Sequence, residues 1–124
     1  SKFHRGVSTG APVEVWGSGG AVRDFLYSED AARALRLISE EFSGSINVAT
    51  GSTVTIRELV ELLRRVSGYA GELRWQQDKP EALRQASYDI TQLRALGFAP
   101  AVDLERGLDA TLRWFGAHAD SVRR

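Results

Sequence analysis

The sequence of 124 residues contains no cysteine and no methionine, and it has only three prolines and two histidines. The lack of cysteine excludes disulfide-stabilised scaffolds, thiolate metal sites and cysteine nucleophiles. His4 and His118 lie at opposite ends of the chain, in no spacing typical of metal ligands, and we expect both at the surface. No serine lies in a Gly-x-Ser-x-Gly motif, which disfavours hydrolysis by a nucleophilic serine.

Net charge is also absent, because 16 basic residues balance 16 acidic ones. A basic surface is the usual mark of proteins that bind nucleic acids or anionic membranes, so we expect neither partner. No apolar run approaches the roughly 18 residues that a membrane-spanning helix needs, and the first residues do not resemble a signal peptide. With 43% hydrophobic residues, the composition predicts a globular, cytoplasmic protein.

The length is typical of a single domain. The chain nevertheless begins at Ser1, and residues 1–5 read as the end of a helix that is already under way. We therefore expect a piece of a longer protein, although a complete domain with a trimmed tag fits the same observation.

Hydrophobic spacing and turn residues predict helices mixed with short strands. Strands are expected at residues 13–16, 22–27, 46–49 and 72–76, and helices at residues 28–42, 55–67, 89–96 and 103–118. Residues 77–88 form a polar loop expected to contact another group, and the tail from residue 119 is expected to fray. This is an α/β mixture without the regular strand–helix alternation of a complete doubly wound sheet.

Particular residues are expected to start and to face these helices. Ser28 is the predicted N-cap of the first long helix, whose buried face should carry the apolar residues at positions 31, 35, 38 and 42. Thr55 and Glu58 form a capping box for the next helix, and Asp103 is the predicted N-cap of the last one. Glu29 and Asp30 are explained by their place in the first turn of a helix, since they lack the spacing of a calcium loop.

Two features near the first strand suggest ligand chemistry. Residues 17–20 form a glycine-rich run that leads into an extended segment, which favours a hairpin turn over a phosphate loop that opens a helix. Arg23 lies beside Asp24 in an apolar strand, where a charged pair costs stability unless each member has a partner. Either the two residues pair with each other, or the guanidinium binds the carboxylate or phosphate of a ligand. Trp16, Lys79 and Arg84 allow the same structural and ligand-binding interpretations.

Motifs in a fixed order run from one end of the chain to the other, at residues 13–19, 23–27, 29–32, 46–51, 55–59, 79–80, 84, 89–90, 96–98 and 104–108. This series resembles the C-terminal part of the extended short-chain dehydrogenases/reductases that act on nucleotide sugars. The resemblance implies that Arg23 and Arg84 bind the diphosphate of a nucleotide sugar, that Trp16 and Lys2 line its nucleotide end, and that Lys79 also belongs to the substrate site. A GDP-sugar is the favoured substrate.

The resemblance also implies a parent protein with an N-terminal Rossmann half, which binds NAD or NADP and carries a catalytic Tyr-x-x-x-Lys motif. In this chain the residues four positions after the tyrosines are Ala31, Leu73 and Gln92, and no glycine fingerprint stands between a strand and a helix. We therefore expect this chain, residues 1–124, to be the substrate-binding region, with no catalytic residue, no bound cofactor and no activity of its own.

Residues 28–50 are expected to pack on the sheet of the N-terminal half, and the parent is expected to be a homodimer. By itself the chain should then expose a large apolar patch or self-associate.

The late loop departs from the family pattern. GDP-sugar enzymes of this kind tend to read Lys-Pro-Asp-Gly-x-Pro-Arg-Lys, whereas this chain has Gln85 after Arg84 and lacks the glycine and the second proline. The base, the sugar and the choice between epimerase, reductase and 4,6-dehydratase therefore stay open. Two rival hypotheses also stay open: a non-catalytic, stand-alone sugar-nucleotide-binding or regulatory module, and a structural interaction domain with internally paired arginines.

Overall fold

The structure, a computed structural model, describes residues 2–79, 86–119 and 121. Its elements are, in order, α1 (Lys2–Thr9), β1 (Val13–Trp16), β2 (Val22–Arg23), α2 (Ser28–Glu41), β3 (Val54–Thr55), α3 (Ile56–Ser67), β4 (Leu73–Gln76), α4 (Thr91–Ala95) and α5 (Leu104–His118). The irregular mixture of helices and short strands predicted from the sequence is confirmed. Among the described residues no helix combines the length and the hydropathy needed to cross a membrane.

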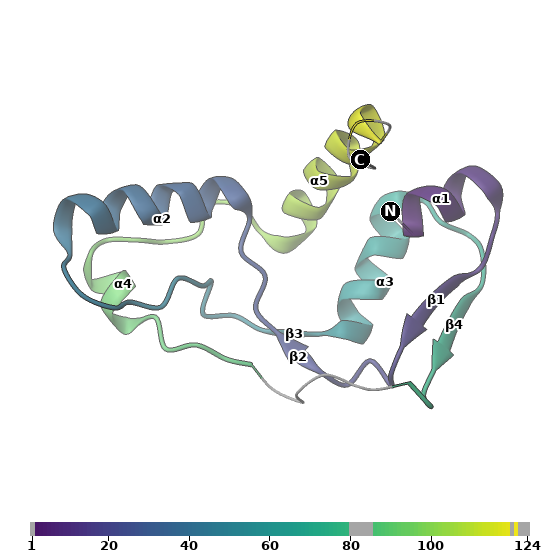
Figure 1. Ribbon diagram of the computed structural model, residues 1–124, viewed down its shortest axis with the longest axis horizontal. Coiled ribbons are helices and arrows are strands. Elements are labelled where there is room, and N and C mark those ends of the chain that lie inside the picture. Colours follow the sequence, from purple (N-terminus) through teal and green to yellow (C-terminus); the bar gives the residue numbers. More distant parts are fainter. Residues whose placement is uncertain (1, 80–85, 120, 122–124) are drawn as a thin grey trace.

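The strands form two small sheets (Figure 1). β1 and β4 run parallel, with Val13 opposite Leu73 and Trp16 opposite Gln76. β2 and β3 run antiparallel, with Arg23 opposite Val54. The arrows of β1 and β4 in Figure 1 point to the lower edge of the molecule, along which β2 also lies. The candidate residues on β1 and β2 are thus carried by two different sheets that meet at one edge.

One hydrophobic cluster joins α1, α3 and the β1–β4 sheet. Its buried members are Phe3, Val13, Val60 and Tyr69. The rings of Phe3 and Tyr69 meet edge to face, with 5.7 Å between their centroids, and the Tyr69 hydroxyl donates to the carbonyl oxygens of Ala11 and Glu72. A buried tyrosine needs such a partner for its hydroxyl, so this contact fixes the turn after α1 against the start of β4.

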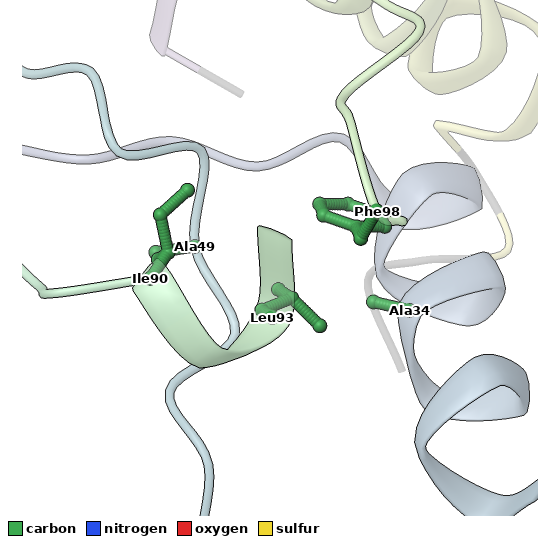
Figure 2. Close-up of a cluster of buried hydrophobic side chains, with 5 residues drawn as sticks. All are labelled: Ala34, Ala49, Ile90, Leu93 and Phe98. Carbon is green, nitrogen blue, oxygen red and sulfur yellow. The ribbon is translucent and has the colours of Figure 1, made fainter. Parts of the chain in front are cut away.

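A second cluster lies at the other end of the molecule, between α2 and α4. Figure 2 shows Leu93 of α4 between Ala34 of α2 on one side and Ala49 and Ile90 on the other, with Phe98 beside them. These five residues are each at most 5% exposed, and none belongs to the first cluster. The described chain therefore has two separate hydrophobic cores, joined through the β2–β3 sheet.

The predicted caps of α3 and α5 are confirmed. The Thr55 hydroxyl accepts from the backbone N–H of Glu58, and the Glu58 carboxylate accepts from the backbone N–H of Thr55 at 2.7 Å. These hydrogen bonds hold the pKa of Glu58 below its usual value. Asp103 accepts from the backbone N–H of Arg106 at 2.8 Å. Both helices therefore begin where their capping residues predict.

The prediction for the start of α2 was wrong, whereas the prediction for its buried face was right at Ile38, which packs on the second cluster, and wrong at Leu35. Tyr27 is the N-cap and makes no side-chain capping bond, while Ser28 is already helical. The buried residues of α2 are Asp30 and Ala34, and Leu35 is 61% exposed. The apolar residues of α2 form two stripes along the helix. Periodicity alone could not show that the more deeply buried stripe is the one that also contains the charged residue Asp30.

Asp30 explains which stripe is buried. Its carboxylate is 1% exposed and accepts from the backbone N–H groups of Ala101 and Val102 and from the guanidinium of Arg33. Burial alone raises the pKa of Asp30, but these hydrogen bonds and the charge of Arg33 outweigh that effect and lower the pKa. Asp30 thus ties α2 to the segment before α5, a role beyond the first-turn placement expected from the sequence.

The strand predicted at residues 46–49 is not observed, since no described residue pairs with this segment in a ladder. The extended segment predicted at residues 22–27 is a strand only at Val22–Arg23. In both cases the residues favour extended structure, but a strand also requires a neighbouring backbone to complete its hydrogen bonds.

Candidate functional site

Arg23 lies on β2 with its side chain half-buried. Its guanidinium donates one hydrogen bond, from Nη1 to the carbonyl oxygen of Val22 at 2.6 Å. Among the described residues no carboxylate lies within 4 Å of it, so the interpretation of an internal pair with Asp24 was wrong. Arginine has five N–H donors, and those that the fold leaves unused can bind an anionic ligand.

Asp24 has a different partner. Its carboxylate accepts from the backbone N–H and the hydroxyl of Thr50, at 2.9 and 2.8 Å, and from the backbone N–H of Gly51 at 2.9 Å. Gly51 has a φ of 74°, which favours glycine. Asp24 therefore fixes the end of β2 to the turn at residues 50–51, and it leaves the neighbouring arginine without a competing carboxylate.

Arg84 lies outside the described residues, but Ala86, two residues later, forms a hydrogen bond with β2. The backbone N–H of Ala86 donates to the carbonyl oxygen of Val22 at 3.1 Å, the same oxygen that accepts from Arg23. The chain two residues after Arg84 therefore lies beside the strand that carries Arg23. Lys79 is exposed just after the end of β4, where its N–H donates to Gln76.

Lys2 and Trp16 line a cavity of about 530 Å³ between α1, β1, α3 and α5. Lys2 Nζ donates to the carbonyl oxygen of Glu14 at 2.8 Å, and Trp16 is 59% exposed. Arg23 is not among the residues that line this cavity. The structure thus brings Lys2 and Trp16 together and places Arg23 on the neighbouring sheet.

The glycine-rich run between β1 and β2 is a turn that joins two sheets. Gly17 and Gly19 have φ values of 81° and 79°, and the carbonyl oxygen of Ser18 accepts from Arg57. A Cβ on Gly19 would lie 2.6 Å from the ring of Trp75, so only glycine fits there. The run leads into β2 and not into a helix, as expected, but β1 and β2 do not pair and the turn is not a hairpin.

The sequence did not single out Glu14, which lines the same cavity as Lys2 and Trp16. Glu14 and Trp16 are exposed on β1 and face away from the core. Val13 is buried and Val15 is half-buried on the other face of the strand. The alternation of side chains along a strand is the signal that could have identified it, because residues i and i+2 share a face.

Among residues 2–79, 86–119 and 121, no group of three or more His, Cys, Asp or Glu side chains gathers in an arrangement that could hold a metal ion. The residues of this chain do not fit a nicotinamide dinucleotide, because the glycine-rich run opens no helix and no tyrosine is followed four positions later by lysine.

The chain is similar to known proteins in sequence and in fold. Residues 1–49 match the NAD dependent epimerase/dehydratase family. GDP-L-fucose synthase 1 of Arabidopsis thaliana is 38% identical over 117 residues, which cover 92% of this chain and 36% of that protein. GDP-L-fucose synthase of Escherichia coli (strain K12) is 35% identical over 134 residues, with coverages of 98% and 42%. The solved structure of UDP-glucose 4-epimerase from Thermotoga maritima, with UDP-glucose, is 31% identical with a TM-score of 0.84, over 94% of this chain and 38% of that one.

In sequence and in fold the chain is therefore similar to one part of the extended short-chain dehydrogenases/reductases, and it has an α/β fold. Within that family it is similar to the GDP-L-fucose synthases. The chain spans about two fifths of the length of the relatives it matches. This partial coverage is consistent with the C-terminal part expected from the sequence.

Proposed function

We propose that this chain is the nucleotide-sugar-binding C-terminal part of an NAD(P)-dependent epimerase, reductase or dehydratase similar to GDP-L-fucose synthase. Arg23 and Arg84 bind the diphosphate, Trp16 and Lys2 line the nucleotide end, and Lys79 adds a cation at the same edge. The observation that carries the proposal is the guanidinium of Arg23, which has no carboxylate partner among the described residues and lies beside the chain that leads to Arg84.

Two arginines around a diphosphate suit its charge, because each charge-assisted hydrogen bond contributes on the order of 1.5–3 kcal/mol. Binding energy gained at the chemically inert nucleotide end positions the distant sugar for reaction. In this proposal the chain binds and orients the substrate, while the chemistry occurs on groups that the rest of the parent protein supplies.

The parent protein would bind NAD or NADP in an N-terminal Rossmann half, against which residues 28–50 of this chain pack. Two features support this arrangement: the exposed Leu35 on α2 and the extended residues 46–48, which have no strand partner among the described residues. A GDP-sugar is the favoured substrate, because the GDP-L-fucose synthases of Arabidopsis thaliana and Escherichia coli are among the relatives of this chain. A homodimer in the cytoplasm, with no nucleic-acid or membrane partner, remains a prediction.

The test is a calorimetric titration of the complete protein with GDP, UDP, dTDP and CDP, repeated with Arg23→Ala. One nucleotide should bind saturably, and the variant should bind it at least about tenfold more weakly, which corresponds to about 1.4 kcal/mol. Arg65→Ala is the matched control, because Arg65 is 67% exposed on α3, lies outside residues 28–50 and pairs only with Glu105 among the described residues. Equal binding by all three proteins would assign Arg23 to a structural role.

The rival hypothesis of a stand-alone module without catalysis makes a different prediction about the complete protein. An enzyme should carry, upstream of this chain, a Gly-x-x-Gly-x-x-Gly strand–helix unit and a Tyr-x-x-x-Lys motif. It should also convert a nucleotide sugar that carries the base it binds, and that conversion should require NAD or NADP. Nucleotide binding with neither motif present would favour the module.

A further inference from the structure

Arg57 lies at the junction of the two sheets that carry the candidate substrate residues. It follows β3 by two residues, and β3 pairs with β2, where Arg23 lies opposite Val54. The Cζ atom of its guanidinium lies 4.3 Å from the centroid of the Trp75 ring on β4. β4 pairs with β1, the strand that ends at Trp16. One side chain thus starts beside the sheet that carries Arg23 and contacts the sheet that carries Trp16.

The start of α3 also holds the glycine-rich run that connects β1 with β2. Nη2 of Arg57 donates to the carbonyl oxygen of Ser18 at 2.5 Å, and its backbone N–H donates to the carbonyl oxygen of Gly19 at 2.9 Å. The backbone N–H of Ile56 donates to the carbonyl oxygen of Ala21 at 2.9 Å. The first N–H groups of a helix have no partner within the helix, so they are available for such bonds.

The glycine-rich run needs contacts of this kind to hold the two sheets in one arrangement. Three of its four residues are glycines, and glycine has access to more backbone conformations than any other residue. The ring of Trp75, by contrast, packs against the first hydrophobic cluster. Because a guanidinium is attracted to the face of an indole ring, Arg57 ties the carbonyl oxygen of Ser18 to this anchored ring.

We propose that Arg57 is a positioning residue that sets the separation between Trp16 at the nucleotide end and Arg23 at the diphosphate end, an inference that rests on the proposed function. A nucleoside diphosphate reaches both ends at once. It gains the full interaction energy of both ends only when their separation matches its own length, without a cost for rearranging the protein. Arg57 has this effect through the glycine-rich run and the position of Arg23, and the role requires no contact with the ligand.

The test is a double-mutant cycle in the complete protein. Calorimetric titration measures the affinity for whichever of GDP, UDP, dTDP and CDP binds best. Arg57→Ala removes the contact with Trp75 and the side-chain hydrogen bond to Ser18, and it should weaken binding at least about fivefold. In the Arg23→Ala background the same change should weaken binding by less than about twofold, because the position of an absent guanidinium no longer matters.

Arg65→Ala is the matched control on the same helix. The guanidinium of Arg65 pairs with Glu105, away from the glycine-rich run, so its removal should leave the affinity unchanged in both backgrounds. Thermal denaturation of every variant identifies those that are folded at the temperature of the titration. Arg57→Gln is a milder second variant for the same cycle, since it keeps an N–H donor and loses the charge above the ring.

The outcomes separate this inference from the proposed function. Equal losses of affinity in the two backgrounds would overturn the positioning role, because a direct contact with the ligand or a general distortion adds to the loss caused by Arg23→Ala. An unchanged affinity in folded Arg57→Ala would overturn it too, while weaker binding by Arg23→Ala would retain the diphosphate site. Absence of binding by every nucleoside diphosphate would overturn the proposed function, and the role of Arg57 with it.

Discussion

Asp24 and Asp30 lie close in sequence, and the fold uses both carboxylates for backbone hydrogen bonds. Arg23, in contrast, has a guanidinium that no described carboxylate pairs with. Burial of a charge is costly unless it is paired, so acidic residues that accept two or three N–H groups are well explained by structure alone. The charged groups without such partners are the ones for which a ligand provides the simplest explanation.

Asp30→Asn should lower the free energy of unfolding by about 1–3 kcal/mol. The amide group of asparagine directs a donor toward the N–H groups of Ala101 and Val102, so at least one buried donor loses its acceptor. Urea denaturation at neutral pH measures the effect. Asp109→Asn is a suitable comparison, because Asp109 pairs with Arg113 on one exposed face of α5 and should contribute far less.

The pH dependence of this difference has a definite sign. The pKa of Asp30 in the folded protein is lower than its ordinary value of 3.8, so the unfolded chain takes up a proton first as the pH falls. The stabilisation by the charged carboxylate is complete above about pH 4 and is lost as the pH falls through the lowered pKa. Unfolding curves of the unaltered protein and Asp30→Asn should therefore converge below pH 4. A constant difference at all pH values would contradict the role of the charge.

At the scale of elements, α3 is the helix that its own sequence specifies best. It begins with a reciprocal capping box at Thr55 and Glu58 and ends at Gly68, which has a φ of 68°. Thr55→Ala removes the acceptor for the N–H of Glu58 and should lower the free energy of unfolding by about 1 kcal/mol. Thr53→Ala is the matched control, an exposed threonine with no described hydrogen bond, and it should change stability by less than about 0.5 kcal/mol. Thermal denaturation of both variants checks the prediction.

The elements predicted correctly are those whose signals are local. Caps at Thr55 and Asp103 and the alternation in β1 depend on residues only a few positions apart. The buried face of α2 was predicted wrongly because Asp30 is buried by amides about 70 residues later in the chain. The segment at residues 46–49 has the composition of a strand, but composition does not supply the pairing backbone.

In the candidate site, too, some features could be predicted from the sequence and others could not. Arg23 could be identified from the sequence because a charged pair in an apolar strand requires an explanation. The partners of Asp24 could not be predicted, because the N–H groups that donate to its carboxylate, those of Thr50 and Gly51, lie in a turn 26 and 27 residues away. Glu14 was missed because exposed glutamates are common, and only the shared cavity with Trp16 and Lys2 distinguishes it.

At the scale of the whole molecule, two small cores share no residue (Figure 1). The core between α2 and α4 contains five buried hydrophobic residues, two of them alanines, and this is little apolar burial for a stable unit. Leu35 follows Ala34 on α2, about 100° further around the helix, and is 61% exposed. Both observations are consistent with the proposal that the other half of the parent protein covers residues 28–50.

Leu35→Ala in the complete protein tests that proposal. If Leu35 is buried against the N-terminal half, its truncation removes buried methyl groups, leaves a cavity and should cost about 2–5 kcal/mol of stability. Val7→Ala is the comparison, because Val7 is 50% exposed on α1 and lies outside residues 28–50, so a cost below about 1 kcal/mol is expected. Denaturant unfolding of the two variants decides the matter. Equal and small effects would mean that Leu35 stays exposed in the complete protein, and α2 would then not be the surface that joins the two halves.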